Sequence, residues 1–296
     1  MMSLWIVIAL VVLLGVTGSP NVKVSPEPDK VGLLAHPNSV PEYAEEETEI
    51  LGQQEQLIDL VVEEDVMATG ELNPNHYQAQ RAAKVVQHYL NTRHGSPFRL
   101  FGLNRVHSGT AEDVEDSGRK YQLEISVKEI IGNTSEKCSA EVFFPRGERQ
   151  GLDKVQASCD ELLKANTTAQ EMALYEQYKN NQGPLSAQHL PDSHGRIDPD
   201  MRPFWHLGIV ASSFIMLNES NENTLYNMAQ VANITQLPTE NDQLKFDSHI
   251  LLHEMVSQEI IHWKLQFTWS PQEGVKVHQM EQLPHRHELE KPQNTN

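Results

Sequence analysis

The sequence predicts an α+β fold built from two tandem subdomains, each a helix packed on an antiparallel sheet. Two observations predict it. From Trp263 to Trp269, bulky apolar residues alternate with polar ones, a period typical of a half-buried antiparallel strand. In addition, a helical pattern followed by four strand-like runs occurs twice, with an offset of roughly 120 to 130 residues. That offset indicates an internal duplication.

The first subdomain is expected to open with a helix. Asn73-Pro74 offers a favourable N-cap and first helical position, and Gly95 suits the C-terminal cap. Between them, apolar and aromatic residues fall at helical spacing: Ala79, Ala82, Ala83, Val86, Tyr89 and Leu90. Four strand-like runs follow, at 99–107, 121–131, 137–144 and 155–159.

A helix at 168–180 is expected to connect the subdomains, with Met172, Leu174, Tyr175 and Tyr178 partly buried and Gly183-Pro184 ending it. The second subdomain then repeats the first. Asp198-Pro199 begins its helix as Asn73-Pro74 did. Its strand-like runs lie at 225–235, 244–252, 263–271 and 275–280.

A long hairpin is predicted where the run at 250–252 leads into the strand around Trp263. Met255, Val256, Ser257 and Gln258 lie at or near its tip, with Met255 and Val256 exposed. A tip that carries apolar and amide side chains can act as a recognition element. The alternative is that it forms a packed contact between the subdomains.

The N-terminus has the features of a targeting segment. Leu4 to Val16 is apolar but short for a membrane span, and the small residues Thr17-Gly18-Ser19 follow it. We expect a secretory signal peptide at residues 1–18, with an uncleaved anchor as the alternative. Because no other run is long enough to cross a bilayer, no membrane partner is expected.

Most of the acidity lies before the folded part. The net charge is −18, which disfavours a nucleic-acid partner. Between Pro20 and Leu72 there are 13 acidic residues against Lys23 and Lys30. We expect residues 19–71 to be a disordered acidic segment, with a short acidic amphipathic helix at 45–65 as the alternative for its second half. It is either a solvated spacer or a polyanion that binds calcium, calcium carbonate mineral or a basic surface.

A secreted chain commonly carries disulfides and N-linked glycans, and this sequence has candidate sites for both. The two cysteines, Cys138 and Cys159, are expected to form a disulfide, with two buried free thiols as the alternative. Closing a loop of about 20 residues would stabilise the fold by roughly 3 kcal/mol. Four sequons mark candidate glycosylation sites, of which we expect at least one to be occupied: Asn133, Asn166, Asn218 and Asn233.

Patterns of enzyme chemistry are not found. His253-Glu254 begins like the HExxH zinc motif, but Ser257 stands where the second histidine is needed. We found no phosphate-binding glycine loop, no GxSxG elbow and no zinc-ligand spacing. His262 is interpreted as structural, and Asp192, His194 and Asp198 as turn and capping residues. We therefore predict no enzymatic activity, no cofactor and no metal.

Several segments resemble the latexin family. The resemblance covers 72–283 and is carried by the tandem repeat, by PDSHG from Pro191 to Gly195, and by LHEMVSQEII at 252–261. SQEII is its most specific part. The signal-like and acidic segments fit the secreted, ovocalyxin-type members of avian eggshell matrix best. The resemblance implies cystatin-like subdomains at 72–165 and 185–283, joined by a connector helix at 166–184, with a tail at 284–296.

The resemblance also implies inhibition of A-type zinc metallocarboxypeptidases. The inhibitor covers the active-site funnel, and a hairpin glutamine that reaches toward the zinc aligns with Gln258, flanked by Met255, Val256, Ser257 and Glu259. His262 stands where the family has proline, which changes the backbone constraint after the tip. The expected role is in secreted extracellular or eggshell matrix, with antimicrobial protection. The alternative is a structural or mineral-associated matrix protein without inhibition.

Overall fold

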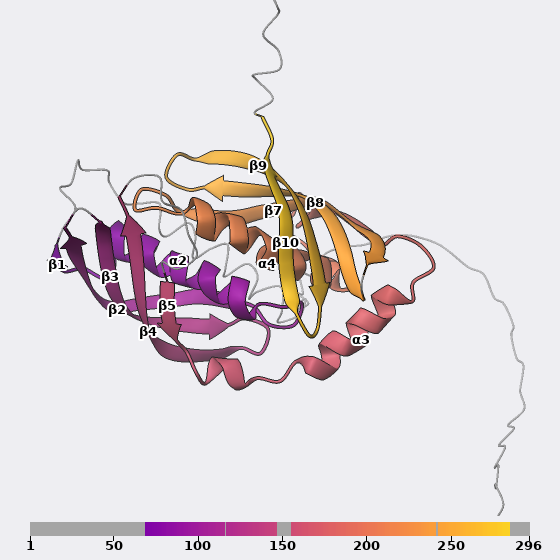
Figure 1. The fold of residues 1–296 in the computed structure, drawn as a ribbon, viewed down its shortest axis with the longest axis horizontal. Helices are drawn as coiled ribbons and strands as arrows, with labels where there is room; N and C mark the ends of the chain where they lie inside the picture. The colour runs from indigo at the N-terminus through magenta and orange to yellow at the C-terminus, as the bar shows by residue number, and fades with distance from the viewer. Residues whose placement is uncertain (1–68, 116, 147–154, 241, 285–296) are drawn as a thin grey trace, which may run out of the picture. The chain divides into compact units, whose positions relative to one another are not determined.

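Two five-stranded antiparallel sheets, each with one long helix, make up the fold (Figure 1). The computed structural model describes residues 69–115, 117–146, 155–240 and 242–284. The expected signal peptide, nearly all of the acidic segment and the tail after 284 lie outside these residues.

The first sheet has the order β1-β2-β3-β4-β5, and the helix α2 (Tyr77–His94) lies between β1 and β2 in the chain. Its strands are β1 (Gly70–Glu71), β2 (Phe101–Val114), β3 (Gly118–Glu129), β4 (Thr134–Pro145) and β5 (Val155–Ser158). A short 3₁₀ helix, η2 (Leu162–Lys164), and the connector α3 (Thr168–Lys179) come next. All four predicted strands of this subdomain and the connector helix are therefore confirmed.

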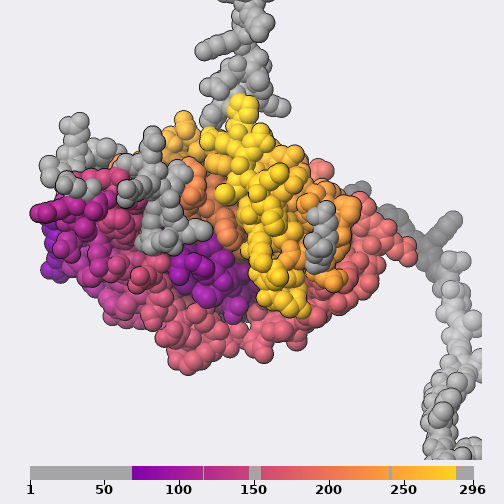
Figure 2. Space-filling view, in the orientation of Figure 1, coloured from indigo at the N-terminus to yellow at the C-terminus, as the bar shows by residue number. Residues whose placement is uncertain are grey.

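The second sheet has the order β10-β9-β8-β7-β6. Its elements are β6 (Ser186–Leu190), η3 (Pro199–Met201), α4 (Arg202–Glu219), β7 (Tyr226–Glu240), β8 (Gln243–Glu254), β9 (Glu259–Ser270) and β10 (Gly274–Gln282). Figure 2 shows β10, in yellow, on the visible face, and most residues of this edge strand are exposed.

The duplication is confirmed in detail. The first residues of α2, β2, β3 and β4 are followed 125 positions later by the first residues of α4, β7, β8 and β9. The strand pairing repeats as well, since β2-β3-β4 and β7-β8-β9 are both antiparallel meanders. The α+β fold class is thus the one that the sequence predicts.

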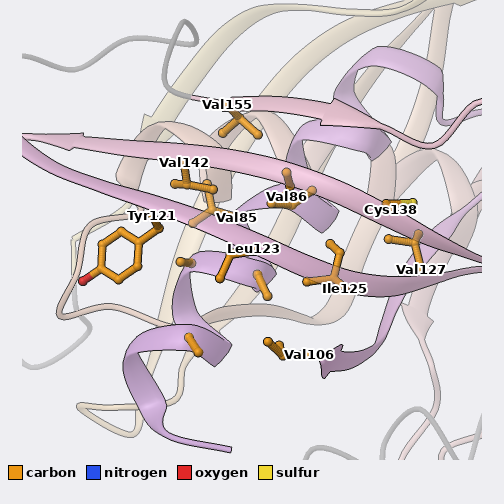
Figure 3. Close-up of a cluster of buried hydrophobic side chains, with 14 of the residues drawn as sticks. Val85, Val86, Val106, Tyr121, Leu123, Ile125, Val127, Cys138, Val142 and Val155 are labelled. Atoms are coloured by element: carbon orange, nitrogen blue, oxygen red, sulfur yellow. The ribbon is translucent and has the colours of Figure 1, made fainter. Parts of the chain in front are cut away.

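Each helix packs on its own sheet and forms a separate core. Figure 3 shows Val85 and Val86 of α2 among strand residues that include Leu123, Ile125 and Val142. The second core holds the aromatic residues Phe246, Phe267 and Trp269, all fully buried. The described residues belong to one compact unit, and the cores interlock: Leu217 of α4 packs in the first core and Leu100 in the second.

Two predicted helix starts are corrected. Helix α2 begins at Tyr77, because Asn73 instead forms a turn in which its Oδ1 accepts the backbone N–H of Asn75 at 3.0 Å. Asp198 does cap a helical segment, since its side chain accepts the N–H of Asp200, but that segment is η3 and α4 follows from Arg202. Strands β1 and β6 were not predicted, because both are short edge strands with too few residues to show alternation.

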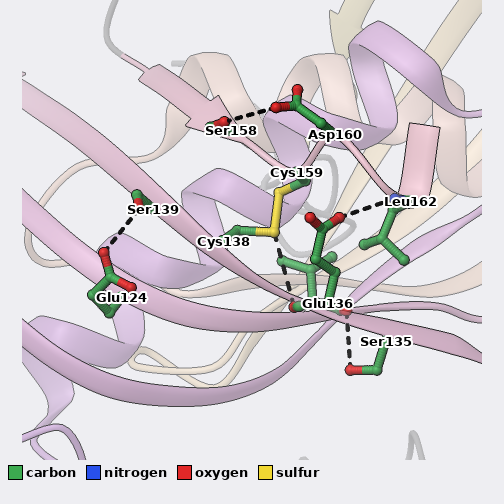
Figure 4. The surroundings of a disulfide bond; sticks show 10 residues. Glu124, Ser135, Glu136, Cys138, Ser139, Ser158, Cys159, Asp160 and Leu162 are labelled. Atoms are coloured by element: carbon green, nitrogen blue, oxygen red, sulfur yellow. Dashed lines mark hydrogen bonds between the residues drawn. A yellow bond between two sulfur atoms is a disulfide. The ribbon is translucent and has the colours of Figure 1, made fainter. Parts of the chain in front are cut away.

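The expected disulfide is present between Cys138 on β4 and Cys159, just after β5 (Figure 4). The two Cα atoms are 5.0 Å apart, and both side chains are buried. The nearby carboxylate of Glu136 accepts the backbone N–H of Leu162 at 2.9 Å. The bridge and this hydrogen bond together tie the segment after β5 to β4. In the described part of the chain, no helix is both long and apolar enough to span a bilayer.

Candidate functional site: the tip of the β8–β9 hairpin

The predicted hairpin tip is confirmed as a four-residue turn. Strand β8 ends at Glu254, β9 begins at Glu259, and these two residues face each other in the strand register. Residues 255–258 connect them. The apolar and polar alternation on either side places Leu252, Leu265 and Phe267 in the core, which fixes the register of the hairpin.

The turn is organised by the carboxylate of Glu254. Its Oε1 accepts the backbone N–H groups of Leu225 at 2.8 Å and Val256 at 3.1 Å, and its Oε2 accepts that of Ser257 at 2.6 Å. Burial on its own raises the pKa of Glu254, but these hydrogen bonds outweigh burial and lower the pKa below its usual value. The ionised carboxylate therefore holds the turn on the loop that precedes β7.

Met255 and Gln258 complete the inner side of the turn. Met255 is 8% exposed, and its Sδ accepts a hydrogen bond from Nδ2 of Asn227. The prediction that Met255 is exposed is therefore wrong, because the turn directs its side chain inward beside β7. Gln258 has a φ of 61°, a left-handed conformation uncommon for a non-glycine residue. Its Nε2 donates to the carbonyl oxygen of Met255 at 2.6 Å.

The outer side of the tip is a mixed apolar and polar surface. Val256 is 43% exposed and Ile260 is 40% exposed, two of the four large hydrophobic residues that are exposed in the described parts of the chain. The side chains of Ser257, Gln258 and Glu259 between them are also exposed. Sequence reasoning missed Ile260, although its position just beyond the predicted tip could have indicated it. The surface has the composition of a small recognition element.

The remaining candidate residues have structural surroundings. His253 and Glu254 lie in a strand, so they do not form the helical pair of a zinc protease. Asp192 accepts the N–H groups of His194 and Arg196, which confirms its role in a turn and lowers its pKa. His262 lies in β9 opposite Leu251 and is exposed. Among the described residues, no group of three or more His, Cys, Asp or Glu side chains is placed to hold a metal.

The four sequons lie in different environments. Asn133 is exposed in the β3–β4 turn, and Asn166 is exposed just before α3. Asn233 is exposed on β7. Asn218 lies in the last turn of α4, and the hydroxyl of its sequon residue Ser220 is buried and donates to the carbonyl oxygen of Met216. Asn218 is therefore the least exposed of the four asparagines in the folded chain.

Comparison with known proteins identifies the family. The family model described as latexin matches residues 72–287, which contain the whole second sheet with its hairpin and all of the first sheet except β1. The chain belongs to the latexin family. Human latexin is 35% identical over 221 residues, which cover 74% of this chain and 100% of latexin.

Two further proteins are similar to this chain. Human retinoic acid receptor responder protein 1 is 34% identical, over 67% of this chain and 70% of its own length. Ovocalyxin-32 of Gallus gallus is 29% identical, over 70% of this chain and 74% of its own length. The family predicted from the SQEII segment and the tandem repeat is thereby confirmed.

Proposed function

We propose that this latexin-family protein is a secreted, non-enzymatic inhibitor of A-type zinc metallocarboxypeptidases, and that it acts by covering the active site with the β8–β9 tip. The observation that carries the proposal is the exposed surface of Val256, Ser257, Gln258 and Glu259 on a turn held by Glu254. This turn lies within the family-matched region and contains the most specific part of the family resemblance.

An inhibitor that covers an active site binds best when its contact surface already has a fixed shape. The three hydrogen bonds to Glu254 and the inward packing of Met255 order the turn before any partner binds. A preordered tip loses little conformational freedom on association, so more of the contact energy appears as affinity. Val256 and Ile260 would supply the apolar contact, and the polar residues between them would set orientation.

Gln258 would contact the enzyme close to its catalytic zinc. In the free protein its Nε2 is held by the Met255 carbonyl at 2.6 Å, which limits the rotamers of the side chain. The amide oxygen would then be the atom presented to the zinc region or to a cationic side chain of the enzyme. Met255 would support Gln258 from below instead of touching the enzyme directly.

The histidine at position 262 does not alter this geometry. His262 lies four residues beyond Gln258, inside β9 and paired with Leu251. The turn before it is shaped by Glu254, and the position that the family occupies with proline is a strand residue here. We therefore propose that inhibition survives the replacement.

The test compares equivalent positions on two hairpins. Val256 lies 125 residues after Ile131, which is also exposed, at 39%, on the β3–β4 turn. The inhibition constant against a pancreatic A-type carboxypeptidase would be measured for the mature wild-type protein, Val256→Asp and Ile131→Asp. We expect Val256→Asp to weaken inhibition by about tenfold or more, as for a central apolar contact, and Ile131→Asp to leave it unchanged. Equal effects of both variants, or no inhibition by the wild type at micromolar concentration, would refute the proposal.

The proposed setting is extracellular, in a matrix such as avian eggshell, where inhibition of proteases would protect against microbes. Among its similar proteins, Ovocalyxin-32 bears a name that points to the same setting. Glycans are proposed at Asn133 and Asn166, which are exposed in loops. Mass spectrometry of the secreted protein, before and after glycosidase treatment, tests both secretion and occupancy.

A second candidate function is supported by the acidic segment. Thirteen acidic residues between Pro20 and Leu72 would attract calcium or calcium carbonate, and the protein would then be a structural matrix component. A deletion variant that lacks the acidic segment distinguishes the two functions. Removal of residues 19–68 would abolish mineral binding, which should also weaken with salt, and would leave inhibition by the hairpin intact.

A further inference from the structure

Two histidines lie against each other on the outer face of the second sheet. Nε2 of His249, on β8, is 3.0 Å from Nδ1 of His262, on β9, and the ring centroids are 5.1 Å apart. The two residues are diagonal neighbours, since His249 pairs with Lys264 and His262 pairs with Leu251. Side chains on one face of adjacent strands are held at this separation by the backbone register.

We propose that His249 and His262 form a binding site for a divalent transition-metal cation of the imidazole-preferring class, such as Zn²⁺. Imidazole nitrogens bind zinc at about 2.0–2.1 Å, so two nitrogens on one ion lie about 2.9 to 3.4 Å apart for ligand angles near 90° to 109°. The observed 3.0 Å falls in that range. Binding of the cation at both nitrogens would move the proton between them to the other nitrogen of the donating ring, so that both imidazoles stay neutral.

The site is open on its outer side. The His262 side chain is exposed and that of His249 is half-buried, so water or a donor from another molecule can complete the coordination. The ligand types favour zinc, copper or nickel over magnesium and calcium, which prefer oxygen. The pair escapes sequence-based detection because the two histidines are 13 residues apart and meet only through strand pairing.

The surrounding charges permit a cation. The ammonium of Lys264, directly opposite His249, is turned to Asp247, with Nζ 3.6 Å from Oδ1. In the strand register, Glu281 of β10 stands opposite Lys264 on its other side. One positive charge is therefore accompanied by two carboxylates. His253 is on the same strand four residues further on, about 14 Å away, and is too distant to join the pair.

This inference is independent of the proposed inhibition. The test is a titration of the full-length protein with ZnCl₂. Binding is measured by calorimetry and by NMR of selectively labelled histidine rings. Magnesium and calcium chlorides serve as cation controls. The variants are His249→Ala, His262→Ala and the matched control His253→Ala, which removes a histidine from the same strand and face.

We expect Zn²⁺ to shift the ring resonances of His249 and His262 together, and Mg²⁺ and Ca²⁺ to leave them unchanged. Either alanine variant of the pair should weaken this zinc binding by at least about tenfold, whereas His253→Ala should not. Zinc binding that is the same in wild type and His249→Ala, or zinc shifts confined to other histidines, would overturn the proposal. Circular dichroism of each variant would show that the fold is retained.

Discussion

Glu129 and Glu254, 125 residues apart, make the same three hydrogen bonds at the tips of the two equivalent hairpins. Each buried carboxylate accepts one backbone N–H from the loop before the subdomain's long strand and two from its own turn. The donors are Leu100, Ile131 and Gly132 for Glu129, and Leu225, Val256 and Ser257 for Glu254. The fourth turn residue is left-handed in both, with φ of 52° at Asn133 and 61° at Gln258. The chain thus carries its own structural control for the candidate site.

The first prediction concerns the Glu254 carboxylate. Glu254→Gln replaces one accepting oxygen by an NH2 group that cannot accept a hydrogen bond, and it removes the charge from the bonds to the remaining oxygen. We expect a loss of about 1–3 kcal/mol in the free energy of unfolding, measured by denaturant titration. Glu129→Gln should cost a similar amount of stability. Only Glu254→Gln should also weaken carboxypeptidase inhibition. An equal loss of inhibition in both variants would argue against a site at the second tip.

The second prediction concerns pH. The folded-state pKa of Glu254 is lowered, so its stabilising contribution is complete above the unfolded carboxylate pKa of about 4.3 and is lost as pH falls through the lower, folded value. The difference in unfolding free energy between wild type and Glu254→Gln should therefore be constant near neutral pH. This difference should become smaller as the pH falls through the folded-state pKa of Glu254. Unfolding curves from pH 7 down to pH 3 measure this. A difference that grows on acidification would contradict the lowered pKa.

The third prediction separates the side chain of Gln258 from its backbone. Gln258→Gly removes the amide and also relieves the strain of a Cβ at positive φ, which is worth roughly 1 kcal/mol, whereas Gln258→Ala removes the amide and keeps that strain. Both variants should lose inhibition to the same degree. The glycine variant should have the higher thermal midpoint of the two, because it alone relieves the strained backbone. If glycine at this position retained full inhibition, the role proposed for the amide would be wrong.

The fourth prediction concerns the packing of α4 on its sheet. Gly208 lies 125 residues after the buried Ala83 of α2, and a Cβ at Gly208 would be 2.5 Å from Cγ2 of the buried Val231. Gly208→Ala should destabilise the protein by about 1–3 kcal/mol, because overpacking exceeds the gain of about 1 kcal/mol in helix propensity. Gly183→Ala is the control, since no atom lies within 4 Å of its Cβ position. Equal stability of both variants would show that Val231 can move aside.

The fifth prediction concerns the disulfide. Reduction of the Cys138–Cys159 bridge, which spans 21 residues, should lower the free energy of unfolding by about 3 kcal/mol in the chain-entropy model. A Cys138→Ala/Cys159→Ala protein should show the lower stability in both oxidising and reducing buffer. Because the bridge joins β4 to the segment after β5, hydrogen exchange should rise there more than in the cysteine-free second sheet. A uniform rise over both sheets would indicate that the subdomains unfold as one.

The elements themselves were predictable because their signals are local. Alternation from Trp263 to Trp269 determined a half-buried strand, and Leu265, Phe267 and Trp269 are indeed fully buried. The repeated order of helix and strands determined the duplication, and the pairing of the only two cysteines agreed with their positions on adjacent segments. The position of the hairpin turn between Glu254 and Glu259 was likewise set by polar residues that interrupt two apolar runs.

The tertiary structure decided which side chains the turn presents. Nothing in the sequence near Glu254 indicates that it accepts an N–H from Leu225, 29 residues earlier, or that Met255 turns inward while Val256 and Ile260 face outward. The meeting of His249 with His262 depends in the same way on the pairing of β8 with β9. A period of two or 3.6 residues records which face of an element is buried, but in a turn the directions of side chains are set by contacts with distant segments. For this protein, therefore, the sequence alone determined the architecture and the family, whereas strand register and long-range hydrogen bonds determined the shape of its candidate site.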